Sequence, residues 1–222
     1  MYHSYTVDEH TLKAIGILHG IETGALSQAA PVATEVMPEI ESRRALYVAM
    51  LLHDIAKGRG GNHSVLGAEV AVVVCPRMGL SHEETETVSW LILHHLLMSK
   101  IAFRYDLNDP QTIEDFASIV QSPERLKLLL VLTVADIRAV GPNIWNGWKA
   151  TLMRDLYCSC DAVLRGADPA VIALGNAEEA RQEAAAKLVD WDAARFAAHA
   201  ENMPLTSWTG GDCESQVHHA RR

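Results

Sequence analysis

The stretch ALYVAMLLHDIAKGRGGNH, residues 45–63, decides the fold. Its first half is apolar apart from His53 and Asp54, so it predicts a buried helix that carries both residues. An unpaired carboxylate in such a helix would be very costly, because burial removes its hydration. The pair therefore requires a compensating positive charge, which a metal ion can provide.

A glycine-rich loop follows this helix. Gly58 stands where a residue of positive φ ends a helix, with Lys57 in the last turn. The loop 58–62 comes next, and His63 closes it. The rest of the chain is therefore searched for residues that complete a site beside this loop.

Composition indicates one globular domain with a sizeable core. The chain has 222 residues, of which 49% are hydrophobic and 21% charged. Its formal net charge of -9 argues against non-specific nucleic-acid binding, because there is no surplus of basic side chains to neutralise phosphates. Eleven histidines are many for this length and justify a search for metal ligands.

The cysteines lack the spacing of a zinc finger or a disulfide framework, and we expect reduced thiols in a cytoplasmic protein. They are Cys75, Cys158, Cys160 and Cys213. We expect neither a signal peptide nor a membrane span, because no apolar run approaches ~18 residues.

The remaining patterns predict helices. Residues 6–9 match a capping box, Thr6 with Glu9, and the helix that it opens places His10 on its inward face. Ser81 and Glu84 form a second box, opening a helix to about residue 97. Further helices are expected at residues 64–75, 112–120, 122–140, 145–164 and 168–200, with candidate breaks at Gly175 and Asp190.

No alternating apolar pattern favours a sheet, so the fold class predicted is all-α, a helical bundle. Residues 23–42 are expected to be mostly loop with one short helical piece. We expect residues 1–203 to form the domain and residues 204–222 a polar tail or linker.

Six nitrogen or oxygen donors lie on apolar helices or at their ends: His10, His53, Asp54, His63, His95 and Asp136. Such a set suits manganese, magnesium, iron or zinc better than a soft thiolate metal. Neighbouring helical residues point ~100° apart, so His53 and Asp54 converge on one ion at the helix edge or serve two ions. Because six ligands exceed the need of one ion with an open position, we favour two ions bridged by Asp54.

The order His, His-Asp, Asp resembles the HD superfamily of metal-dependent phosphohydrolases, and His63 with His95 resembles its two-metal branch. Longer blocks are similar to the HD domain of the bifunctional PII uridylyltransferase/uridylyl-removing enzymes. These blocks are HDIAKGRGGNHSVLGA (53–68), HLLMS (95–99), RYDLNDPQTI (104–113) and LTVADIRAVGPNIWNGWK (132–149).

The resemblance implies hydrolysis of UMP from a tyrosine of the nitrogen-regulatory PII protein, by attack of a metal-bound hydroxide on phosphorus. It also implies a nucleotidyltransferase domain and ACT domains elsewhere in the parent enzyme, so we expect either an excised domain or a stand-alone relative. The family pattern has an asparagine where this chain has His94. The ligand on this helix is therefore His95 or His94.

Roles follow from this chemistry. Asp54 and Lys57 are predicted to be catalytic, and Lys57 with Arg59 to bind the substrate phosphate. For Trp145 and Trp148, helix packing is favoured over stacking on uridine. The alternatives are a nucleotidase or cyclic-dinucleotide phosphodiesterase of the same superfamily, and a non-catalytic module that binds nucleotide or PII.

Overall fold

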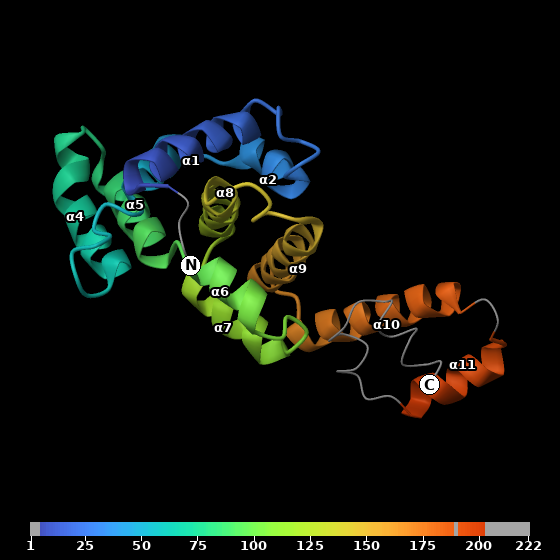
Figure 1. Cartoon of the computed structure of the whole chain (residues 1–222). Helices are drawn as coiled ribbons and strands as arrows, with labels where there is room; N and C mark the ends of the chain where they lie inside the picture. The colour runs from blue at the N-terminus through green and yellow to red at the C-terminus, as the bar shows by residue number, and fades with distance from the viewer. Residues whose placement is uncertain (1–4, 189–190, 203–222) are drawn as a thin grey trace.

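The computed structural model describes residues 5–188 and 191–202, and over these ranges it is all-α, as the sequence predicts (Figure 1). The helices in chain order are α1 (Val7–Glu22), α2 (Pro31–Val36), the short 3₁₀ helix η1 (Met37–Glu39), α3 (Arg43–Leu52), α4 (His63–Arg77), α5 (His82–His94), α6 (Leu97–Arg104), α7 (Pro110–Val120), α8 (Pro123–Ala139), α9 (Gly147–Leu164), α10 (Pro169–Lys187) and α11 (Ala193–Asn202).

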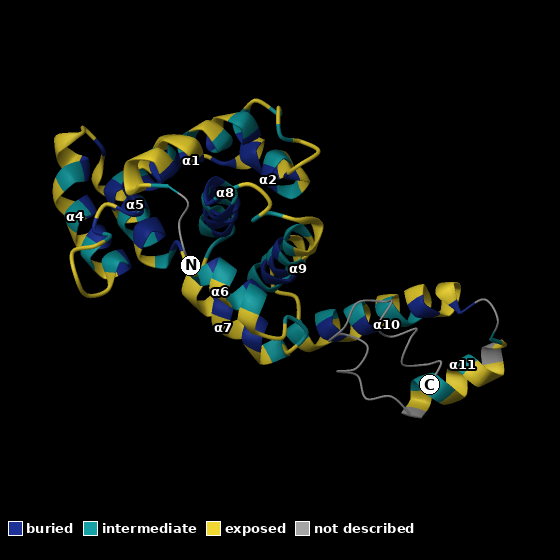
Figure 2. Cartoon of the chain, viewed as in Figure 1, coloured by how far each residue is buried: buried dark blue, intermediate teal, exposed yellow. Residues whose placement is uncertain are grey.

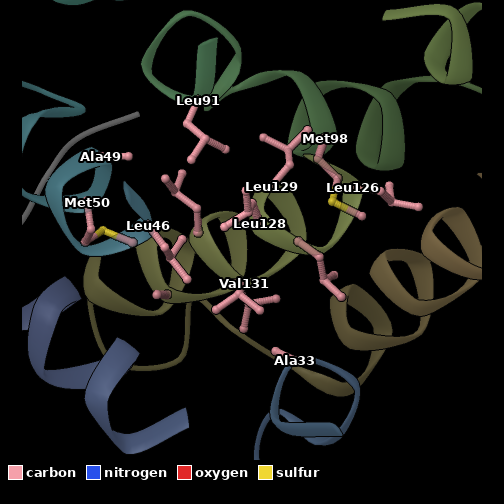
Figure 3. Packing of buried hydrophobic residues seen from close by; sticks show 14 of the residues in the cluster. Ala33, Leu46, Ala49, Met50, Leu91, Met98, Leu126, Leu128, Leu129 and Val131 are labelled. Atoms are coloured by element: carbon pink, nitrogen blue, oxygen red, sulfur yellow. The ribbon is translucent and has the colours of Figure 1, made fainter. Parts of the chain in front are cut away.

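Helix α8 is the centre of the bundle. It contacts α1, α2, α3, α5, α6, α7 and α9, and its residues from Leu128 to Ala135 are almost completely buried. Figure 3 shows its leucines packed among side chains of the surrounding helices, including Leu46, Met50, Leu91 and Met98. Each fully buried leucine stabilises the fold by roughly 1.5–3 kcal/mol. The position of α8 is therefore firmly fixed.

Side-chain caps mark the starts of some of the helices. In α5, Ser81 accepts from the Glu84 amide, and the Glu84 carboxylate accepts from the Ser81 amide, so the predicted capping box is present. In α8, Ser122 caps the helix and Pro123 occupies its first position, as expected. The first predicted box is wrong, because the Thr6 side chain does not cap α1. Its hydroxyl instead donates to the Asp8 carboxylate and lowers the pKa of that group.

Several helix boundaries differ from the prediction. Helix α3 ends at Leu52, so His53 and Asp54 lie in the turns after it rather than within it. Helix α5 ends at His94, and a separate helix, α6, begins two residues after His95. Helix α10 runs through Gly175 without a break.

The outer parts of the fold are α4 and the pair α10–α11 (Figure 1). Helix α4 packs mainly on α5 and slightly on α3, and its outer face is exposed, with Val72 and Val73 in solvent (Figure 2). Helix α10 contacts α7 and α9, and Ala177 and Ala184 form a small cluster with α11. The predicted tail, residues 204–222, lies outside the described residues.

Within the described ranges, no helix combines the length and the apolar character that a membrane crossing requires.

Candidate metal centre

The structure brings the six predicted donors together, from five helices or their ends. They are His10 in the first turn of α1, His53 and Asp54 directly after α3, His63 at the start of α4, His95 directly after α5, and Asp136 near the end of α8. Four of them are almost fully buried, and the side chains of Asp136 and His63 are 14% and 28% exposed.

A first group of donors comes from the bundle itself. His10, His53 and Asp54 each offer a ligand atom, and these atoms all lie within 4.8 Å of one another. The His10 Nε2 lies 2.8 Å from Asp136 Oδ1 and 3.3 Å from His53 Nε2. The His53 Nε2 lies 3.6 Å from the same Asp136 oxygen. We refer to His10, His53, Asp54 and Asp136 as the inner group.

A second group contains Asp54, His63 and His95, whose ligand atoms again lie within 4.8 Å of one another. Asp54 belongs to both groups through different oxygens. Its Oδ2 lies 3.7 Å from His53 Nε2, and its Oδ1 lies 3.7 Å from His63 Nε2. We refer to Asp54, His63 and His95 as the outer group. The two oxygens of Asp54 thus face histidines of different groups.

Backbone carbonyls fix the protonation of two histidines. Nδ1 of His53 donates to the Met50 carbonyl at 2.7 Å, and Nδ1 of His95 donates to the Ile92 carbonyl at the same distance. Because a carbonyl only accepts, each Nδ1 carries a proton, and this bond turns the Nε2 of each ring towards the centre. Metal-ligating histidines are commonly oriented in this way by a partner of the other ring nitrogen.

The acidic side chains stay ionised despite their burial. Burial raises the pKa of Asp136, but hydrogen bonds from His10 and His53 outweigh it and hold that pKa well below its usual range. Burial also raises the pKa of Asp54, but His53 and the Lys57 ammonium, whose Nζ donates to Oδ2 at 2.6 Å, lower it overall. Two carboxylates therefore carry charge inside the protein near neutral pH.

The imidazoles are shifted in opposite directions. Burial lowers the pKa of His53, but Asp136 and Asp54 outweigh that effect and raise it overall. Burial lowers the pKa of His95 to about 4, so this ring is neutral near pH 7. A neutral His95 is ready to act as a ligand without first losing a proton.

The donor set fits divalent ions. Ligands bound at ~2.1 Å from one ion lie about 3–4 Å apart, and the separations around His53 and Asp54 fall in or near that range. Two ionised, buried carboxylates need positive charge nearby, and Lys57 provides a single positive charge beside Asp54. The arrangement of imidazole nitrogens and carboxylate oxygens suits manganese, iron, zinc or, with more oxygen from water, magnesium.

The rings of His95 and His94 have different neighbours. The ring of His95 lies 5.5 Å from that of His53 and 5.3 Å from that of His63, between centroids. His94 instead packs on Trp90, with centroids 4.9 Å apart. Only His95 joins the donor groups found among the described residues, so the structure favours His95, although its role as a ligand remains a prediction.

The remaining predicted residues lie around the centre or away from it. Lys57 contacts Asp54 directly and is partly exposed, whereas Arg59 is exposed and lines a groove on α4 with Leu66. Trp145 donates its indole N–H to the Ala29 carbonyl, which is the packing role expected of it. Trp148 is 60% exposed and stacks on Phe103.

The sequence alone did not reveal the carbonyls of Met50 and Ile92. The available signal was their position three residues before His53 and His95, which a C-terminal helix turn brings close. That spacing becomes informative only when the helix is known to end at the histidine.

Comparisons with known proteins agree with this geometry. Residues 3–139 match the HD domain family. The chain is 57% identical over 222 residues to the bifunctional uridylyltransferase/uridylyl-removing enzyme of Azospirillum brasilense, covering all of this chain and 24% of that protein. It is 52% identical over 221 residues to the protein of the same name from Rhodospirillum rubrum, again with 24% of the relative covered. The chain thus spans about a quarter of the length of these curated relatives.

Proposed function

The chain belongs to the HD domain family, and from this membership we propose that it is a metal-dependent phosphohydrolase that removes UMP from the uridylylated tyrosine of the nitrogen-regulatory PII protein. The observation that carries the proposal is Asp54, a buried carboxylate shared by the inner and outer groups. The proposed substrate follows from relatives named as uridylyl-removing enzymes, which match the whole chain.

We propose two divalent ions, of manganese, magnesium, iron or zinc. His10, His53, Asp54 and Asp136 would hold one, and Asp54, His63 and His95 the other. When bound, such ions neutralise phosphate charge and supply a nucleophile derived from water. Without bound cations, the repulsion between Asp54, Asp136 and a phosphate would oppose substrate binding.

The chain's own residues position the phosphate. The Lys57 ammonium lies 2.6 Å from Asp54 and its side chain is 29% exposed, so it can reach both the centre and a bound phosphate oxygen. Arg59 is proposed as a second, more exposed contact for the phosphate. The leaving group is a tyrosine phenolate, whose pKa of ~10 lets it depart with little help from an acid. The site therefore needs no dedicated proton donor.

The proposed setting is that of the relatives. We propose that the domain acts together with the nucleotidyltransferase and ACT domains of a longer enzyme, and that PII is its protein substrate. A cytoplasmic location is also proposed, since Cys75, Cys158 and Cys160 are free thiols. We propose no nucleic-acid partner, in keeping with the net charge of -9.

The direct test is release of UMP from uridylylated PII. Purified chain, stripped of metal and then supplied with Mn²⁺, is incubated with uridylylated PII, and UMP is measured by chromatography. We expect release that depends on the added ion. Free nucleotides and cyclic dinucleotides are assayed in parallel at the same concentrations.

Each outcome separates the proposal from its alternatives. Hydrolysis of a free nucleotide or cyclic dinucleotide but not of uridylylated PII would contradict the substrate assignment and favour another phosphohydrolase of the family. Saturable binding of Mn²⁺ without hydrolysis of any of these compounds would favour a non-catalytic module.

A further inference from the structure

Helix α4 lies close against α5 at Gly67. A Cβ atom placed on Gly67 would lie 2.9 Å from Cγ2 of Ile92, a separation that real Cβ atoms almost never show. It would also lie 3.8 Å from the His53 carbonyl oxygen. Ile92 is fully buried and β-branched, so its methyl group has little freedom to move aside. Any larger residue at position 67 must therefore shift α4, α5 or the Ile92 side chain between them.

Gly67 is not required for the backbone conformation, because it lies inside a helix and is absent from the glycines of positive φ. Inside a helix, glycine costs roughly 1 kcal/mol relative to alanine. Glycine at position 67 therefore destabilises α4 locally, but its lack of a side chain allows the close approach to Ile92.

The contacts of Gly67 belong to the residues that hold the metal ligands. Ile92 provides the carbonyl that orients His95, and the carbonyl oxygen of His53 lies 3.8 Å from the same Cβ position on Gly67. His63 is the first residue of α4, about one helical turn before Gly67. Because α4 packs mainly on α5, the approach at Gly67 decides where His63 stands relative to Asp54 and His95.

We propose that Gly67 is a positioning residue for the outer group: it sets His63 at the distance from Asp54 and His95 at which the three side chains share one ion. The inner group does not depend on α4, because His10, His53 and Asp136 come from α1, the end of α3 and α8. Substitution of Gly67 should therefore lower the affinity for one of the two ions and leave the affinity for the other unchanged. The inference rests on the two-ion site proposed above.

The test measures Mn²⁺ binding rather than hydrolysis. Equilibrium dialysis of the metal-free full chain, followed by metal analysis, gives the number of ions bound at each free concentration. We expect two binding steps in the original chain, and His63→Ala identifies the step that belongs to the outer group. Gly67→Ala should lower the Mn²⁺ affinity of that step by about 10- to 100-fold, which is the usual effect of losing a contact that orients a metal ligand. The affinity of the other step should not change.

The matched control is Gly16→Ala, in α1. Gly16 is also a helical glycine, and a Cβ added there meets nothing within 4 Å. This variant should bind both ions as the original chain does, which separates the effect of crowding from that of removing a helical glycine.

A double-mutant cycle with Ile92→Ala tests the mechanism and covers the case in which Gly67→Ala does not fold. Ile92→Ala leaves space between α4 and α5 and should also lower the Mn²⁺ affinity of the outer group selectively. Combining it with Gly67→Ala replaces the lost methyl group, so affinity should recover relative to Ile92→Ala alone.

Four results would overturn the inference. They are equal weakening of both steps by Gly67→Ala, no weakening of either step, no recovery in the double variant, and a single ion bound by the original chain. Absence of any Mn²⁺ binding to the original chain would contradict the proposed function as well, so the two failures are distinguishable.

Discussion

Asp54 is the residue on which both donor groups depend. Its two oxygens face different histidines, and its side chain is only 4% exposed. A carboxylate in that position is tolerated because His53 and the Lys57 ammonium compensate its charge. No other donor of the described centre belongs to both groups.

Replacement of Asp54 by alanine should therefore abolish the binding of both ions and the hydrolysis of uridylylated PII together. His53→Ala should do the same, because His53 contacts Asp54, Asp136 and His10. Metal analysis after dialysis and an assay of UMP release check both effects. The control is Asp115→Ala, an exposed acid on α7 that bonds to Gln111. Full activity in Asp54→Ala or His53→Ala would refute the site.

Lys57 should contribute to turnover rather than to metal binding. It is partly exposed, and its ammonium can contact both Asp54 and a phosphate oxygen. Lys57→Ala should slow UMP release by about 10²- to 10³-fold, as removal of one donor from a developing negative charge does, and both ions should remain bound. Steady-state kinetics and metal analysis measure the two effects.

Lys187→Ala, which removes an exposed ion pair with Glu183 in α10, is the control for loss of a lysine. Loss of metal from the Lys57 variant would show that this residue instead holds Asp54 in place.

At the scale of the secondary-structure element, two helices end in the same way. The last turns of α3 and α5 are each followed by a histidine whose Nδ1 donates to the carbonyl three residues earlier. The two ends meet, with the rings of His53 and His95 5.5 Å apart between centroids. The helix ends, rather than the helix faces, thus present these ligands.

The neighbours His94 and His95 should behave differently when each is replaced by alanine. His95→Ala should remove the outer ion, since it deletes one of three ligands in that group. His94→Ala should retain both ions and lose only the contact with Trp90, about 0.5–1.5 kcal/mol of stability. Dialysis with Mn²⁺ and thermal unfolding distinguish the two. Loss of an ion from His94→Ala with retention in His95→Ala would reverse the assignment.

The sequence predicted most helices because their signals are local. Ser81 with Glu84 and Ser122 with Pro123 mark helix starts by hydrogen bonds and geometry that need no tertiary contact. The donor residues were also predictable, because a polar residue in an apolar helix such as Asp136 requires a partner.

Other features depend on tertiary contacts and could not be predicted. Asp54 and His95 lie just beyond the ends of α3 and α5, although the apolar pattern continues through both positions. The Thr6 side chain does not cap α1, and its hydroxyl instead donates to the Asp8 carboxylate. Gly67 looks like any helical glycine until α5 is placed beside it.

At the scale of the molecule, the centre connects α1, α4, α8 and the ends of α3 and α5. A divalent ion that binds this arrangement binds the folded chain and not the unfolded one, so it must stabilise the fold. At a free concentration about 100 times the dissociation constant, the gain is about 2.7 kcal/mol per ion.

Addition of Mn²⁺ to the metal-free chain should therefore raise the melting temperature by about 5–10 °C per ion, at the usual ~2–4 °C per kcal/mol for a protein of this size. Circular dichroism during heating measures the shift, and excess chelator should reverse it. His53→Ala is the control, because it should show no shift. An unchanged melting temperature in the original chain at saturating Mn²⁺ would contradict native-state binding at this centre.

The pairing of His10 with Asp136 joins residues 126 positions apart in the chain. A contact of that span forms late, since the entropy of closing so long a loop must be overcome before the contact gives anything in return. We therefore expect the donor residues to come together only after the chain has crossed its folding barrier. Bound cations should leave the refolding rate nearly unchanged and lengthen the lifetime of the native state instead.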